Sequence, residues 1–297
     1  MSKNHLIPTE TVNKHTQNLG TSSPKQIAQM INDEDFNAAR AVQKASVSIG
    51  KTIQLAADTF LAGGKIIFIG AGTSGRLGVL EAAECVPTFG TKPSQIIGII
   101  AGGKKAMFRS QEGAEDDCVQ GGKDILKVAK EKDLVIGLTA SGVTPYVLGA
   151  LQQAKQLHSH TVLLACNKKA DTSFADIFIF LDTGAEALNG STRMKAGTAT
   201  KMALNAISTG AMARAGKVYG NLMVDVQPTN KKLIRRAIRL IASITKTDEE
   251  TAEKLLIASG KSVKTAIVMQ MKKLNKGQAE KLLKKHHGFL EGVLHEK

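Results

Sequence analysis

The chain has 297 residues, 42% of them hydrophobic, and carries 40 Lys and Arg against 26 Asp and Glu, a net charge of +14. This length allows a large buried core, and no run approaches the roughly 18 uninterrupted apolar residues of a membrane span. The stretch MSKNHLIPTE lacks the apolar centre of a signal peptide. Cys85, Cys118 and Cys166 are an odd number with no CxxC spacing. This suits a reducing compartment and argues against a structural zinc site. We therefore expect a cytoplasmic protein.

The positive charge is concentrated near the C-terminus, where residues 231–297 contain 16 Lys and Arg against 7 Asp and Glu. The chain has no Trp and only two Tyr, so it lacks the aromatic side chains on which single-stranded nucleic acids stack. No helix-turn-helix pattern precedes the apolar runs. We interpret the basic region as a solvated lysine-rich helix face and expect no nucleic-acid and no membrane partner.

Residues 24–62 show the spacing of amphipathic helices, which we expect to cover a sheet. Five short runs rich in β-branched residues follow, each apolar on both faces, as buried parallel strands are. These runs are 65–72, 95–102, 133–141, 160–167 and 176–184. Because helical patterns separate them, the sequence predicts an α/β fold with a doubly wound, five-stranded parallel sheet. Ligands of such sheets bind beyond the carboxyl ends of the strands.

The character of the sequence changes after the last apolar run. Residues 190–220 predict a long helix whose alanines suit close packing. From about Asn230 the pattern becomes a set of short amphipathic helices, with Asp or Ser at N-cap positions and Gly between several of them. We predict two domains: 1–228, the α/β domain with its N-terminal covering helices, and 229–297, a small helical domain.

Glycines and hydroxyl side chains gather where the first and third apolar runs end, in GAGTSG and TASGVT. A helix N-terminus there would present free N–H groups and partial positive charge to an anion. Ser and Thr are also ordinary N-caps, so a structural role is the alternative. The residues expected to contact a ligand are Gly72, Thr73, Ser74, Thr139, Ser141 and Thr144.

The nucleotide alternatives fail on detail. GAGTSG follows the glycine pattern of a dinucleotide-binding site, but such a site also needs an acidic residue at the end of the second strand, and the second apolar run ends IIAGGKK. A P-loop is excluded because the chain has no GxxxxGK[ST] motif. A monophosphate held by hydroxyls and helix ends remains. No metal ion and no cofactor is expected.

Several motifs carry a family resemblance. GAGTSGR with TASGVTP resembles the sugar isomerase (SIS) fold of phosphosugar-binding proteins. AEALNGSTRMKAGTATK (185–201) is similar to the signature shared by N-acetylmuramic acid 6-phosphate etherases and the glucokinase regulatory protein. INDEDFNAARAV (31–42), LEAAECVPTFG (80–90) and EGAEDD (112–117) also resemble etherase segments. The resemblance implies a lyase of cell-wall recycling that cleaves the D-lactyl ether of N-acetylmuramic acid 6-phosphate, giving N-acetylglucosamine 6-phosphate and D-lactate.

The resemblance also implies two catalytic carboxylates. Glu84 matches the family's proton donor to lactate, and Glu115 matches the base at C2; such an elimination needs neither metal nor redox cofactor. From the residues alone, the apolar and proline-ended surroundings of Glu84 predict partial burial, which would raise a carboxyl pKa. Cys85, directly after Glu84, is expected to be a buried structural thiol.

Further residues are expected near the ligand. Ser191 and Thr192, at the predicted start of the long helix, are expected to contact the sugar or phosphate. Arg193 and Lys195 either neutralise the phosphate or lactate carboxylate, or serve a dimer contact or the helix start. Two other function classes stay open: a non-catalytic phosphosugar sensor that binds a kinase, and an aldose–ketose phosphate isomerase.

Helix geometry bears on assembly. At about 1.5 Å per residue, a straight helix carries Glu84 about 15 Å from Ser74, further than a hexose phosphate reaches. Either the phosphate therefore lies at the 139–144 loop, or Glu84 serves the site of a second subunit. We expect a homodimer in which Glu84 and Glu115 of one site come from different chains.

Overall fold

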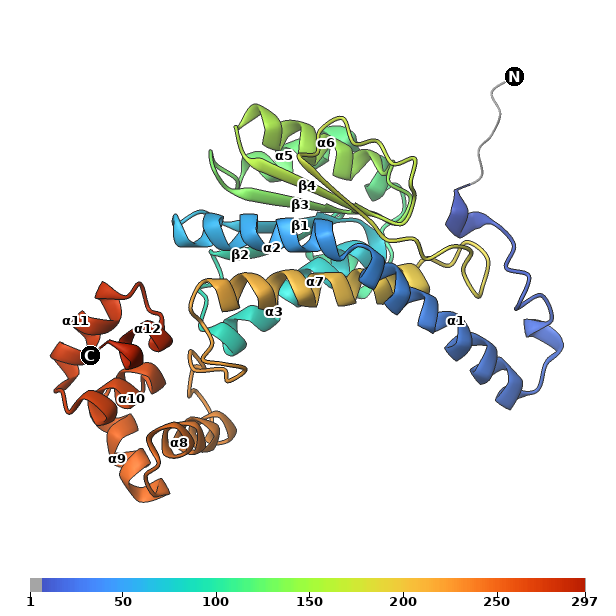
Figure 1. Ribbon diagram of the computed structural model, residues 1–297. Coiled ribbons are helices and arrows are strands. Elements are labelled where there is room, and N and C mark those ends of the chain that lie inside the picture. Colours follow the sequence, from blue (N-terminus) through green and yellow to red (C-terminus); the bar gives the residue numbers. More distant parts are fainter. Residues whose placement is uncertain (1–6, 297) are drawn as a thin grey trace. The chain divides into compact units, whose positions relative to one another are not determined.

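The computed structural model describes residues 7–296 (Figure 1), so the first six residues of the stretch tested for a signal peptide lie outside the described residues. Packing divides the chain into two units, each described here by itself. Unit 1 comprises the chain up to Ala83 together with Ser94–Ser208. Unit 2 comprises Glu84–Pro93 together with the chain from Thr209. The predicted boundary between a domain of residues 1–228 and one of residues 229–297 stays a prediction.

Unit 1 is built on five parallel strands in the order β2-β1-β3-β4-β5. The strands are β1 (Ile66–Gly70), β2 (Ile96–Ile100), β3 (Leu134–Leu138), β4 (His160–Ala165) and β5 (Ile177–Phe180). Every residue of β1 and β3 is buried, as expected of central strands with helices on both faces. The predicted α/β fold and all five predicted strands are confirmed. The strand order reverses between β1 and β3, which is where such sheets bind ligands.

Helices cover both faces of this sheet (Figure 1). Those in unit 1 include α1 (Pro24–Lys44), α2 (Ser46–Leu61), α4 (Lys104–Phe108), α5 (Cys118–Leu126) and α6 (Pro145–Gln156). α5 and α6 pack on one face, against a core that contains Ile67, Val135 and Leu163, and α2 packs on the other. The covering helices predicted over 24–62 are thus confirmed as α1 and α2.

Three single-turn 3-10 helices and two longer helices complete the connections. The 3-10 helices are η1 (Pro8–Glu10), η2 (Leu19–Thr21) and η3 (Ala114–Asp116). α3 (Gly72–Phe89) and α7 (Lys195–Arg214) each begin in unit 1 and end in unit 2. The helix predicted over 190–220 is confirmed as α7 but is shorter than predicted at both ends. The buried Glu186 carboxylate accepts the N–H groups of Lys195 and Ala196, which fixes the helix start there and leaves Ser191 and Thr192 outside the helix.

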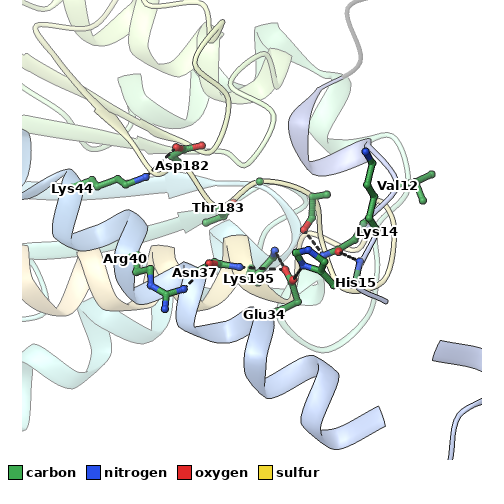
Figure 2. Close-up of a pocket in the computed structure, with 13 residues that line it drawn as sticks. Val12, Lys14, His15, Glu34, Asn37, Arg40, Lys44, Asp182, Thr183 and Lys195 are labelled. Atoms are coloured by element: carbon green, nitrogen blue, oxygen red, sulfur yellow. Dashed lines mark hydrogen bonds and ion pairs between the residues drawn. The ribbon is translucent and has the colours of Figure 1, made fainter. Parts of the chain in front are cut away.

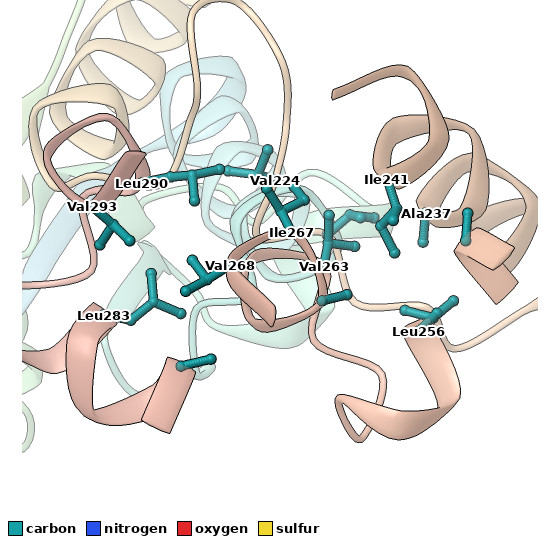
Figure 3. Packing of buried hydrophobic residues seen from close by; sticks show 14 residues of the cluster. Val224, Ala237, Ile241, Leu256, Val263, Ile267, Val268, Leu283, Leu290 and Val293 are labelled. Carbon is teal, nitrogen blue, oxygen red and sulfur yellow. The ribbon is translucent and has the colours of Figure 1, made fainter. Parts of the chain in front are cut away.

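Unit 2 contains five further helices around an apolar core (Figure 3). They are α8 (Lys231–Thr245), α9 (Glu249–Ala258), α10 (Val263–Lys272), α11 (Lys276–Lys285) and α12 (Leu290–His295). Asp248 and Ser262 accept the N–H groups that begin α9 and α10, as the sequence predicts. The core side chains from α8 to α12 include Ile241, Ile267 and Leu290. Among residues 7–296, no helix is long and apolar enough to cross a membrane.

Candidate active site

The loops that follow β1 and β3 line one cavity of unit 1, with a volume of about 410 Å³. We call it the hydroxyl cavity. The predicted ligand-contact residues that line it are Gly72, Thr73, Ser74, Thr139, Ser141, Thr144 and Thr192, and they are joined there by Glu115. Ser191 and Glu84 are not among its lining residues. The sheet brings the two loops together because β1 and β3 are adjacent parallel strands whose carboxyl ends share one edge.

Three hydroxyl groups of the loop after β3 form a small network. The Thr139 and Thr144 hydroxyl oxygens are 2.7 Å apart, and the Thr139 and Ser141 oxygens are 3.2 Å apart. Thr144 occupies the N-cap position of α6, yet its side chain makes no capping hydrogen bond. The purely structural N-cap alternative therefore fails for Thr144. Its hydroxyl lies instead with two others at the N-terminus of α6, where an anion is favoured.

The glycines of GAGTSG allow the start of α3 to approach β1 closely. A Cβ on Gly75 would lie 2.5 Å from the Gly70 carbonyl oxygen, and one on Gly70 would lie 2.8 Å from the Gly75 nitrogen. Gly72, the first residue of α3, has φ +52°, a conformation that glycine adopts without strain. The tight turn sets Thr73 and Ser74 in the first turn of α3, where backbone N–H groups lack helical partners.

Carboxylates line the hydroxyl cavity as well. Glu115 lies in η3 and is exposed, and Glu10 and Asp116 line the cavity with it. Among the described residues, no Lys or Arg side chain lines this cavity. The cavity therefore combines hydroxyl and N–H donors, which suit an anion, with acidic groups, which suit proton transfer.

Glu84 lies on α3, in the part of the helix that belongs to unit 2. The predicted partial burial of Glu84 is wrong, because its side chain is exposed. The next residue, Cys85, takes the inward-facing position and is 2% exposed, as expected of a structural thiol.

Lys195 lies outside the hydroxyl cavity and lines a second one, of about 450 Å³ (Figure 2). Its side chain is 2% exposed, and its ammonium group forms an ion pair with Glu34 of α1. Glu34 also accepts a hydrogen bond from His15, at 2.9 Å. Burial raises the pKa of Glu34, but the hydrogen bonds from Lys195 and His15 outweigh it and lower the pKa to about 2. Lys195 thus serves the helix start and a buried ion pair. Arg193 is exposed and lines neither cavity.

Sequence reasoning also missed the burial of another carboxylate, Glu81 on α3. It is 4% exposed and accepts hydrogen bonds from the Lys201 ammonium group, at 2.8 Å, and from the Ser208 hydroxyl, both on α7. Glu81 therefore ties α3 to α7. Among residues 7–296, no group of three or more His, Cys, Asp or Glu side chains could hold a metal ion, and the expectation of no cofactor stays a prediction.

Comparison with known proteins gives full-length relatives. Residues 48–155 match the glucokinase regulatory protein N-terminal SIS domain, and residues 220–270 match the C-terminal lid domain of glucokinase regulatory protein. The chain is 46% identical to an N-acetylmuramic acid 6-phosphate etherase of Photorhabdus laumondii, over 98% of this chain and 97% of the relative. It is 48% identical to one of Listeria welshimeri, over 97% of this chain and 98% of the relative.

Proposed function

The chain belongs to the N-acetylmuramic acid 6-phosphate etherases, and on that premise we propose that it cleaves the ether joining D-lactate to C3 of N-acetylmuramic acid 6-phosphate. The products are N-acetylglucosamine 6-phosphate and D-lactate. Identity to curated etherases over nearly the whole chain is the observation that carries this proposal. We further propose that the reaction serves the reuse of cell-wall amino sugars in the cytoplasm.

We propose that the phosphate binds at the hydroxyl network of Thr139, Ser141 and Thr144. Support comes from the 2.7 Å and 3.2 Å spacings of these oxygens at the N-terminus of α6. Glu115 lines the same cavity, so a sugar held there by its phosphate would extend toward a carboxylate.

The elimination uses two carboxylates in different protonation states. In the open-chain sugar, the C1 aldehyde acidifies C2–H, and the Glu115 carboxylate removes that proton. The electron pair of the C2–H bond forms the C2–C3 double bond as the C3–O bond breaks, and the Glu84 carboxyl group protonates the departing lactate oxygen. Water then adds its oxygen to C3 and a proton returns to C2.

Lactate release tests the proposal directly. Purified protein mixed with N-acetylmuramic acid 6-phosphate should release D-lactate, whereas a phosphosugar sensor or an aldose–ketose isomerase would release none. In heavy-oxygen water the label should enter C3 of the product sugar, because the C3–O bond breaks and water returns to C3. Label in the lactate would instead mean another cleavage and would overturn the mechanism.

We propose a homodimer as the active form. Support comes from Glu84, which is not among the residues that line the hydroxyl cavity, whereas Glu115 is. On α3, ten residues, or about 15 Å, separate Glu84 from Ser74, which also lines that cavity. A two-fold assembly lets each chain lend a residue to its partner's site.

A further inference from the structure

The proposed substrate carries two anionic groups, a phosphate and the carboxylate of its lactyl group. The hydroxyl network suits one anion, but among the described residues no Lys or Arg lines that cavity, and three carboxylates do. Lys195, which the sequence offered for this purpose, is buried in its ion pair with Glu34. A second anion close to these carboxylates needs a cation from elsewhere, because like charges repel at short range.

A smaller cavity of about 100 Å³ supplies such a cation. It shares Ala71, Gly72 and Glu115 with the hydroxyl cavity, and it is also lined by Arg76 of α3 and by Glu112. Glu115 therefore lies at the junction of the two cavities. The Glu112 carboxylate accepts a hydrogen bond from the Ser110 hydroxyl at 2.7 Å. Since α3 begins at Gly72, Arg76 lies one turn into the helix that starts in the hydroxyl cavity.

The guanidinium of Arg76 is held by its inner nitrogen. Nε donates a hydrogen bond to the Met107 carbonyl oxygen at 3.2 Å. Within residues 7–296, the two outer nitrogens of Arg76 make no hydrogen bond and no ion pair. A guanidinium fixed in this way presents two parallel N–H donors, the pattern that matches both oxygens of a carboxylate.

We propose that Arg76 binds the carboxylate of the D-lactyl group in this smaller cavity. The inference rests on the proposed function, because it assigns a subsite for that substrate. Glu115 acts at C2 and the lactyl ether leaves from C3, the neighbouring carbon, so the lactyl group lies beside Glu115. The small cavity adjoins Glu115 at that place. Arg76 thereby selects ethers that carry a carboxylate and holds the leaving group during elimination.

The test compares two substrates, N-acetylmuramic acid 6-phosphate and its methyl ester, in which the lactyl carboxylate is neutral. Wild type should prefer the acid. Arg76→Gln should lower kcat/KM for the acid by about 100-fold and for the ester by less than about threefold. Inhibition by D-lactate should weaken at least about tenfold in the same variant. Arg109→Gln is the matched control, since Arg109 is exposed, lies two residues beyond Met107 and lines neither cavity.

Equal losses on acid and ester, or the same pattern in Arg109→Gln, would overturn the subsite. Should Arg76→Gln not fold, Arg76→Lys keeps the charge but not the paired donors. It should lose about tenfold on the acid alone, and unchanged discrimination between the substrates would overturn the proposal. A wild-type protein that released lactate from neither substrate would instead refute the proposed function.

Discussion

At the scale of single residues, four glutamates illustrate two different environments. Glu34 and Glu81 are each 4% exposed and hold lysines. Glu84 and Glu115 are exposed to solvent. Buried, paired carboxylates are fixed in charge and geometry, so they suit a structural role. A carboxylate that must exchange protons with substrate needs access to it, and Glu115 has that access from the hydroxyl cavity.

The two proposed catalytic glutamates should lose different steps when changed. Glu115→Gln cannot accept the C2 proton, so both turnover and exchange of that proton with deuterium should stop. Glu84→Gln cannot protonate lactate, so turnover should fall by at least about 100-fold while C2 exchange persists. Lactate assays and nuclear magnetic resonance of substrate in deuterium oxide measure both. Turnover of Glu84→Gln within tenfold of wild type would rule out its role as the acid.

The hydroxyl network should act mainly in binding. Ser141→Ala removes one anion-binding hydroxyl and leaves both proposed catalytic carboxylates intact, so KM should rise about tenfold while kcat changes less than about threefold. Steady-state kinetics measures the split. Ser94→Ala, at an exposed position before β2, is the control and should match wild type. A larger fall in kcat than rise in KM would place Ser141 in the chemical step.

The Glu34–Lys195 ion pair should matter for stability. Glu34→Gln leaves a buried ammonium group unpaired, so the free energy of unfolding should fall by about 3 kcal/mol in urea titrations at pH 7. Glu250→Gln, which breaks the exposed pair with Lys254, should change it by less than about 0.5 kcal/mol. Equal effects of the two variants would show that burial of the Glu34–Lys195 pair adds nothing.

The same ion pair sets a pH dependence. Because the folded-state pKa of Glu34, about 2, lies below its ordinary value of 4.5, the stabilisation is fully present above pH 4.5. It is lost as the pH falls through the folded-state pKa. The difference in unfolding free energy between wild type and Glu34→Gln should therefore shrink between pH 4.5 and about 2. A difference independent of pH over this range would contradict the ion-pair account.

At the scale of elements, the contact between α5 and α6 positions the hydroxyl cavity. Glu115 lies in η3 just before α5, and the 139–144 loop leads directly into α6. The helices approach so closely that a Cβ on Gly121 would lie 1.9 Å from the Tyr146 carbonyl oxygen, and one on Gly149 would lie 2.0 Å from the Cys118 carbonyl oxygen. Glycine at both contacts lets the backbones of α5 and α6 touch. The spacing of these two helices is thereby fixed, and with it the spacing of η3 and the 139–144 loop, which lead into them.

Neighbouring glycines of α5 provide a matched test of this contact. Gly121→Ala should push the helices apart, lowering the free energy of unfolding by about 2 kcal/mol and weakening turnover. Gly122→Ala places its Cβ 3.5 Å from the nearest atom, an ordinary contact, and should be neutral or stabilise the helix by up to about 1 kcal/mol. Thermal unfolding of both variants decides the point. Indistinguishable Tm values would mean that the backbones adjust without cost.

At the scale of the whole molecule, the proposed homodimer makes a prediction about mixed subunits. Glu84→Gln and Glu115→Gln chains should each be inactive alone, but refolding them together should regenerate one intact pair of carboxylates in every mixed dimer if the two come from different chains. Random pairing then restores about a quarter of wild-type activity. Mixing without denaturation is the control for slow exchange. No recovery after refolding would mean that both glutamates of a site belong to one chain.

Local patterns in the sequence determined the strands, the covering helices and the two hydroxyl loops. The strands of 66–70 and 134–138 are apolar on both faces, and this needs no knowledge of distant residues. The family motifs likewise indicate the reaction class from the sequence alone. Because the carboxyl ends of parallel strands share one edge of a sheet, the strand pattern also predicted that GAGTSG and TASGVT lie on the same edge. Their direct meeting depends on the adjacency of β1 and β3, which the structure supplied.

Only the tertiary structure decided the partners of charged side chains and the helix start at Lys195. Glu34 and Lys195 are 161 positions apart, and nothing in either local pattern marks them as a pair. The predicted start of α7 near residue 190 failed because the Glu186 carboxylate, supplied by the preceding loop, captures the first N–H groups of the helix. The same holds for Arg76, whose nearness to Glu115 depends on how α3 and the 110–115 loop pack. Periodicity reports the face on which a residue lies, whereas the partner of a charge is set by the three-dimensional packing of distant segments.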